Sequence, residues 1–105
     1  MDLAGRIDTY LDHLRVERAL AKNTLESYAR DLNQLAETLG DRVRAEDVSE
    51  GDLAALLAAN ARRGFGARSS ARQLSAIRGF FKFLVRERVI ERDPTALLER
   101  PKLGR

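Results

Sequence analysis

The sequence lacks several residue types that enzymes and extracellular proteins commonly depend on. It contains no cysteine, which excludes disulfide bonds and thiolate metal sites. Its one histidine, His13, has no second imidazole with which to complete a metal site or an acid–base pair. Ser69 and Ser70 have no candidate base, and Gly64-Phe65-Gly66 lacks the Lys-Ser/Thr that follows a phosphate-binding loop. We therefore expect no catalysis, no cofactor and no metal in this chain.

Long apolar runs and helix-breaking residues are also scarce. No apolar run approaches the length of about 18 residues that a membrane span requires. The first ten residues lack the basic and apolar regions of a secretory signal, so we expect a cytoplasmic protein without a membrane partner. The only two prolines, Pro94 and Pro101, lie near the C-terminus and leave the first 93 residues uninterrupted for helices.

A third deficit is local, because no acidic residue lies between Asp52 and Glu87. The 34 positions between them hold seven Arg or Lys residues. Residues 1–60 carry seven basic and twelve acidic residues, a net charge of −5, whereas residues 61–105 carry twelve and four, a net charge of +8. Such a basic half predicts a surface for a polyanion. The alternative is a solvated charged surface that binds nothing.

Apolar residues recur at helical spacing in four segments, and no alternating stretch is long enough for a strand. A short helical turn is expected at Thr95–Glu99. The sequence thus predicts an all-α bundle of four to five helices over residues 1–100. The four main helices are expected at about 2–18, at about 24–39, from a cap at Ser49 to near Arg62, and from Ser69 or Ser70 to about Arg88.

Capping patterns mark the ends of these helices. Asn23 and Glu26 have the spacing of an N-cap and its reciprocal partner, and Ser49 and Asp52 form a second such pair. Gly40 lies where a left-handed C-terminal cap is expected.

Aromatic residues add three expectations about packing. Tyr10 and Tyr28 lie on apolar stripes and should belong to the core, with His13 at its edge. Phe83 lies on the polar side of the fourth helix, against the pattern. We expect the C-terminal segment containing Leu97 and Leu98 to cover it.

The fourth predicted helix carries a polar face opposite an apolar centre at Ile77 and Phe81. Cationic side chains can neutralise phosphates, and Arg and Ser can also reach base edges in a major groove. Gly79, in the middle of this face, either allows close approach of another group or is a tolerated glycine that costs about 1 kcal/mol. The face consists of Arg68, Arg72, Ser75, Gly79, Lys82 and Arg86.

The start of the second predicted helix offers a second candidate contact. Lys22, Asn23 and Thr24 lie where a helix N-terminus presents N–H groups and a partial positive charge, which favours phosphate. The alternative is that Asn23 only caps the helix.

Three segments then match a family pattern in order and over nearly the whole chain: KNTLESYARDL at 22–32, SSARQLSAIRGFFKFLVRERVI at 69–90 and DPTALLERPKLGR at 93–105. The pattern runs Asn-Thr-Leu, Tyr-x-x-Asp-Leu, Arg-x-Leu-Ser-Ala, Arg-x-Phe-Phe/Tyr-x-Phe-Leu, Asp-Pro and Pro-Lys. In these motifs the chain resembles the N-terminal core-binding domain of Xer-type tyrosine recombinases.

The resemblance implies a SAM-like four-helix domain that forms one jaw of a clamp on a recombination half-site. It implies that the second and fourth helices approach the major groove of double-stranded DNA. It also implies a C-terminal catalytic domain and sister subunits as partners, with the nucleophilic tyrosine in that second domain rather than at Tyr10 or Tyr28. Residues 101–105 resemble the start of the linker to it.

From these arguments we expect the chain to be monomeric and to bind DNA without cutting it. The Xer-like pattern favours chromosome-dimer resolution over integration of phage or transposon DNA. One alternative is a helical protein–protein interaction domain whose basic face binds an acidic partner. Another is a free-standing DNA-binding regulator, against which the linker-like tail argues. The residues expected to contact DNA are Lys22, Asn23, Thr24, Arg68, Ser69, Arg72, Ser75, Arg78, Lys82 and Lys102.

Overall fold

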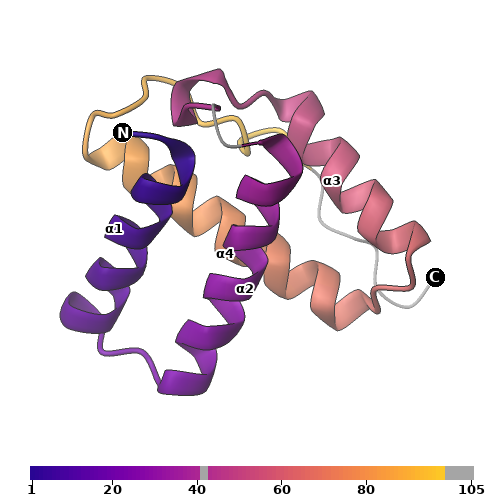
Figure 1. Cartoon of the computed structure of the whole chain (residues 1–105), viewed down its shortest axis with the longest axis horizontal. Coiled ribbons are helices and arrows are strands. Elements are labelled where there is room, and N and C mark those ends of the chain that lie inside the picture. Colours follow the sequence, from indigo (N-terminus) through magenta and orange to yellow (C-terminus); the bar gives the residue numbers. More distant parts are fainter. Residues whose placement is uncertain (41–42, 99–105) are drawn as a thin grey trace.

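A computed structural model describes residues 1–40 and 43–98 of the chain. Over these residues it contains helices and no β-strand, which confirms the prediction of an all-α bundle (Figure 1). None of the helices in the described residues is both long and apolar enough to cross a membrane. The elements are α1 (Leu3–Glu17), α2 (Lys22–Leu39), the short 3₁₀ helix η1 (Ala45–Asp47), α3 (Glu50–Arg62) and α4 (Ala67–Arg86).

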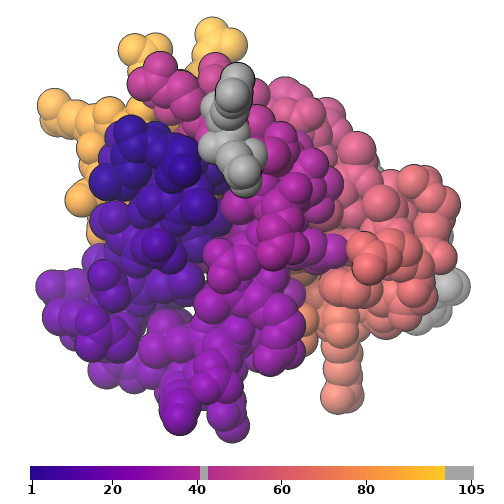
Figure 2. All heavy atoms as spheres, in the orientation of Figure 1, coloured from indigo at the N-terminus to yellow at the C-terminus, as the bar shows by residue number. Residues whose placement is uncertain are grey.

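The four long helices form an orthogonal bundle around α4. α1 and α2 run antiparallel beside each other, α4 crosses behind them, and α3 packs at the other end of α4 (Figure 1). In the space-filling view α1 and α2 lie in front and cover much of α4 (Figure 2). The turn between α1 and α2 is tight, and Ala19 adopts a positive φ of 48° within it. α1 and α2 cover one flank of α4, and on the opposite flank, which we call the open flank, Arg68, Ser75 and Lys82 are exposed among the described residues.

Two of the predicted helix ends are confirmed. Ser49 and Asp52 form a reciprocal capping box, with both side chain–backbone hydrogen bonds at 3.1 Å. Gly40 follows α2 with φ 99°, and its N–H donates to the carbonyl oxygen of Ala36. The glycine relieves the strain that a β-carbon would cause at this φ.

The predicted N-cap role of Asn23 is wrong, and so is the pairing with Glu26. Ala21 is the extended residue before the helix, so α2 begins at Lys22 and Asn23 is already the second helical residue. No side chain accepts a hydrogen bond from the first turn of α2. Similarly, α4 begins at Ala67, earlier than predicted, because the chain turns into the helix directly after Gly66.

The segment after α4 also departs from expectation. Residues 94–97 form hydrogen-bonded turns where the short helical turn was predicted, with the Leu98 N–H donating to the carbonyl oxygen of Thr95, and Glu99 lies outside the described residues. Leu97 is 77% exposed and does not cover Phe83. Phe83 instead packs against α1, with ring centroids 5.2 Å from Tyr10 and 4.9 Å from His13. Phe83 therefore interrupts the polar side of α4, because α1 packs against the helix at this position.

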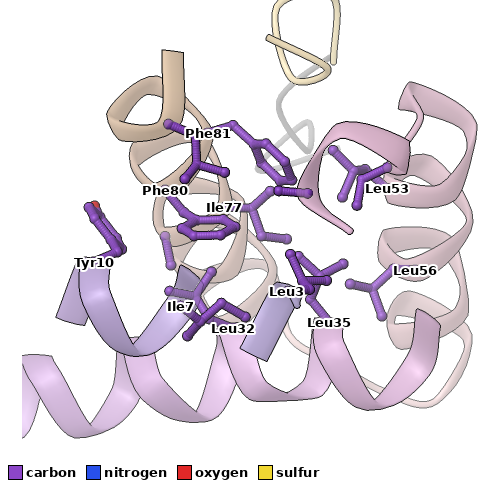
Figure 3. Packing of buried hydrophobic residues seen from close by; sticks show 14 of the residues in the cluster. Leu3, Ile7, Tyr10, Leu32, Leu35, Leu53, Leu56, Ile77, Phe80 and Phe81 are labelled. Atoms are coloured by element: carbon purple, nitrogen blue, oxygen red, sulfur yellow. The ribbon is translucent and has the colours of Figure 1, made fainter. Parts of the chain in front are cut away.

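The hydrophobic core lies between α4 and the other three helices. Ile77, Phe80 and Phe81 of α4 are fully buried and point toward apolar side chains from α1, α2 and α3 (Figure 3). Tyr10 is buried at the edge of this core, as predicted, whereas Tyr28 is only partly buried. The partners of α4 in the core include Leu3, Ile7 and Leu14 of α1, Leu32 and Leu35 of α2, and Leu53 and Leu56 of α3.

A cluster of side-chain amides joins α2, α3 and α4 inside the molecule. Asn60 and Gln73 are 1% and 0% exposed. Asn60 Nδ2 donates to Gln73 Oε1 at 2.7 Å, and Gln73 Nε2 donates to Gln34 Oε1 at 2.7 Å. Gln34 Nε2 closes the ring by donating to Asn60 Oδ1 at 2.8 Å. Because buried amides are costly unless paired, these bonds fix the positions of the three helices relative to one another.

We expect Gln73→Ala to lower the free energy of unfolding by about 1–3 kcal/mol, because it leaves amide groups of Asn60 and Gln34 buried without their partner. The measurement is urea unfolding followed by circular dichroism. Ser75→Ala, two residues away on the exposed side of α4, is the control and should change stability by less than about 0.5 kcal/mol. Equal effects of the two substitutions would mean that the amide cluster contributes no net stability.

Candidate nucleic-acid interface

The open flank of α4 carries an exposed row of basic and hydroxyl side chains. Arg68, Ser75 and Lys82 are spaced seven residues apart, and all three are exposed. Seven residues are nearly two helical turns, so these side chains lie along one line of the helix. The ion pairs found in the described residues include neither Arg68 nor Lys82. This row, which we call the α4 row, is the part of the predicted polar face whose charges are not engaged within the protein.

Arg72 lies beside the α4 row but is held by the protein. Its Nε and Nη2 atoms donate to the two carboxylate oxygens of Asp31 at 2.8 and 3.0 Å. The Asp31 side chain is 4% exposed and that of Arg72 is 38% exposed. The bond to Asp31 raises the pKa of Arg72 above its ordinary value, with burial opposing it more weakly. Arg72 is therefore a fixed guanidinium that bridges α2 and α4, rather than a mobile surface charge opposite the core.

Arg78 is also engaged within the protein. Its side chain is half-buried, and Nη2 donates to the backbone carbonyl oxygen of Leu98. Its Nε atom is buried without a partner in the described residues. Arg78 thus anchors the segment after α4 to the helix, which makes a structural role its main one. Ser69, another residue predicted to contact DNA, is only half-exposed.

The first turn of α2 gives a second exposed polar group of residues. Lys22, Asn23 and Thr24 are all exposed, and their turn has no side-chain cap. The N–H groups at such a helix start carry a partial positive charge and are open to an anion. The absence of the expected Asn23 cap therefore leaves this end of α2 more suited to a phosphate than the sequence indicated.

A groove lies between α1 and α4, and Lys82 of the α4 row is one of its lining residues. It has a volume of about 220 Å³ and is lined by residues from both helices, including Tyr10, Arg18, Gly79, Lys82 and Arg86. Gly79 makes this packing possible, because a β-carbon at this position would overlap the Tyr10 hydroxyl oxygen unless the tyrosine moved. The close approach considered for Gly79 thus occurs, and the approaching group is Tyr10 of α1.

The wall of this groove is built from stacked side chains. The Arg86 guanidinium lies 5.5 Å from the Phe83 ring centroid, and its Nη2 atom lies 3.3 Å from His13 Nε2. Burial raises the pKa of the Tyr10 hydroxyl, with a smaller contribution from Tyr28 and an opposing one from Arg18. The hydroxyl therefore remains a neutral hydrogen-bond donor at neutral pH.

Comparison with known proteins identifies the family of this chain. The sequence profile of the family described as "Phage integrase, N-terminal SAM-like domain" matches residues 7–88. The chain belongs to this family. The match spans all four long helices nearly completely, so both the α4 row and the start of α2 lie within the SAM-like domain.

Curated relatives match nearly all of this chain. The chain is 48% identical over 101 residues to the tyrosine recombinase XerD of Yersinia pestis, covering 92% of this chain and 33% of that protein. It is 42% identical over 103 residues to the XerD of Rhizobium meliloti, covering 97% of this chain and 33% of the relative. The chain thus spans about a third of the length of the relatives that it matches.

The structure places some of the residues predicted to contact DNA next to one another. Arg68, Ser75 and Lys82 share the α4 row, and Lys22 to Thr24 share the start of α2. Lys102 and the linker-like residues 101–105 lie outside the described residues. Sequence reasoning missed the roles of Asp31 and of the amide cluster. The sequence did carry one signal for the amide cluster. Asn60 is a polar residue at a core position, because it continues the apolar stripe of Leu53 and Leu56 at helical spacing.

We expect Arg72→Ala to destabilise the SAM-like domain by about 2–3 kcal/mol, because it leaves the buried Asp31 carboxylate unpaired. A fully buried pair would cost about 3–5 kcal/mol, and water access to Arg72 reduces this figure. Thermal and urea unfolding measure the effect. Lys82→Ala, on the same helix but exposed, is the control and should leave stability nearly unchanged. An Arg72→Ala variant as stable as the control would contradict a structural role for the pair.

Proposed function

We propose that this chain is the DNA-binding module of a site-specific tyrosine recombinase and forms one jaw of a clamp on a recombination half-site. The α4 row carries the proposal, because it is a line of exposed donors on a helix without any acidic residue. Exposed Arg and Lys neutralise phosphates, and a helix of this kind fits a major groove. The start of α2 supplies a second phosphate contact.

Arg72 has a defined place in this proposal. Asp31 engages its Nε and Nη2 atoms, which leaves the Nη1 donors of a partly exposed guanidinium available. A guanidinium held in one plane loses little rotamer entropy when it binds, so it is suited to base or phosphate recognition. We assign direct contacts to Lys22, Asn23, Thr24, Arg68, Ser75 and Lys82, with Arg72 between them. Ser69 and Arg78 take lesser or structural roles, and Lys102 stays a predicted contact.

The remaining features of the proposal concern the complete protein. Its relatives are named tyrosine recombinases and are about three times as long as this chain. We propose that strand cleavage belongs to a C-terminal catalytic domain, with DNA and sister subunits as the other partners. Chromosome-dimer resolution is the role that we favour for the complete protein, and the cytoplasm its location.

We expect the chain to bind duplex DNA with a dissociation constant of roughly 10⁻⁴–10⁻⁶ M at physiological salt, because a single jaw makes few contacts. With four to six phosphate contacts, log K should fall with log[salt] at a slope of about −4 to −5. Fluorescence anisotropy with a labelled short duplex of mixed sequence measures both quantities.

Arg68→Ala and Lys82→Ala should each weaken this binding while melting temperature stays constant. Arg15→Ala on α1 is the matched control, since Arg15 is exposed and lies among acidic residues. Selection from a pool of random duplexes should enrich one half-site. Equal losses in all three variants, or no enriched site, would indicate diffuse attraction to polyanions, as expected for a domain that binds an acidic protein.

We expect no covalent protein–DNA product when the chain is incubated with a nicked half-site duplex. A tyrosine nucleophile requires activating groups around the scissile phosphate. Tyr10 is buried beside Gly79, and burial raises the pKa of its hydroxyl, which disfavours the nucleophilic phenolate. Denaturing gel electrophoresis is the measurement. An adduct that disappears in Tyr10→Phe or Tyr28→Phe would overturn the assignment of cleavage to another domain.

A further inference from the structure

The groove between α1 and α4 has the composition of an anion site. Three cationic side chains line it, Arg18 from the end of α1 and Lys82 and Arg86 from α4, and no acidic residue is among the lining residues. Among the ion pairs of the described residues, one involves a cation of this groove: Arg86 Nε lies 3.8 Å from Glu87 Oε2, and both side chains are more than half exposed. A pair of this kind is weak and is readily replaced by a phosphate oxygen.

The groove is also shaped for a small group. Gly79 lines the groove without a side chain, and the Tyr10 hydroxyl lies next to this glycine. The volume of about 220 Å³ leaves room for a tetrahedral phosphate with bound water. Tyr10 contributes a neutral O–H donor, while the stacking of Arg86 on Phe83 and its contact with His13 fix the direction of the guanidinium. These donors converge from two helices that are far apart in sequence.

The position of the groove relates it to the proposed DNA surface. Lys82 belongs both to the groove and to the α4 row. Arg18 is the C-cap of α1, four residues before Lys22 at the start of α2. The groove therefore shares Lys82 with the α4 row and is linked by a short turn to the start of α2.

We propose that this groove binds a phosphodiester of the DNA backbone, so that α1 takes part in DNA binding through Arg18, Tyr10 and His13. The inference rests on the proposed DNA-binding function and extends it to a helix outside the two expected to enter the major groove. Arg18 and Arg86 supply charge, Tyr10 supplies a neutral donor, and His13 orients Arg86.

His13, the single histidine of the chain, serves as a local NMR probe of the groove. We expect the His13 imidazole resonances in NMR spectra to move when a short duplex of mixed sequence is added, because the bound phosphate contacts its neighbour Arg86. Arg18→Gln should remove most of this change. It should also make the salt slope of duplex binding shallower by about 1, as expected for the loss of one phosphate contact.

Arg15→Gln is the matched control, because it removes the same charge from α1 at a residue that pairs with Asp12 and does not line the groove. It should leave both readouts unchanged, and Arg18→Lys should retain them. Circular dichroism checks that each variant is folded. Two outcomes would overturn the proposed phosphodiester site in the groove: unchanged His13 resonances while the duplex binds, or equal effects of Arg15→Gln and Arg18→Gln. Neither outcome would contradict the proposed DNA contacts of the α4 row.

Titration with inorganic phosphate distinguishes a DNA phosphodiester in the groove from a free anion. Inorganic phosphate at matched ionic strength should move the His13 resonances less than the duplex does. An equal movement with phosphate and none with duplex would indicate an ion site unrelated to DNA and would overturn the inference. A chain that binds no duplex at all would overturn the proposed function together with it.

Discussion

The buried polar contacts among α2, α3 and α4 are the constraint on which the rest of the structure depends. Apolar packing tolerates small shifts between helices, whereas a buried amide or carboxylate loses its partner when its helix moves. The amide ring of Gln34, Asn60 and Gln73, with the Asp31–Arg72 pair next to it, sets how α4 crosses α2. The orientation of α4 in turn decides which of its basic residues face outward.

Because of this constraint, the cationic residues of α4 fall into two groups with different roles. Arg72 and Arg78 are engaged by a carboxylate and a backbone carbonyl, so they act first in holding the fold. Arg68 and Lys82 are exposed and take part in none of the ion pairs of the described residues, so their charges are available to a ligand. Counting charges along the sequence treats all of these residues alike, although their environments differ.

The sequence was sufficient to predict the helices, because each helix buries a stripe of apolar residues with a period that no strand shares. It also predicted the family, which the profile match confirms. It did not reveal the Asp31–Arg72 pair, because a helical pattern shows which side of a helix is polar but not which partner lies opposite. Phe83 was misplaced for the same reason, since its partners come from α1. The Asn23 cap failed because Ala21, two residues earlier, is the N-cap residue of α2.

Cross-saturation NMR between a short duplex and the isotope-labelled chain tests the central claim most directly, because it reports contact rather than indirect change. The account predicts that saturation transferred from the DNA reaches the exposed side of α4 around Arg68, Ser75 and Lys82, and the first turn of α2. Amides of α3 should receive none. Transfer centred on α3, or spread evenly over the surface, would contradict the assignment of this flank of α4 as the DNA-binding surface.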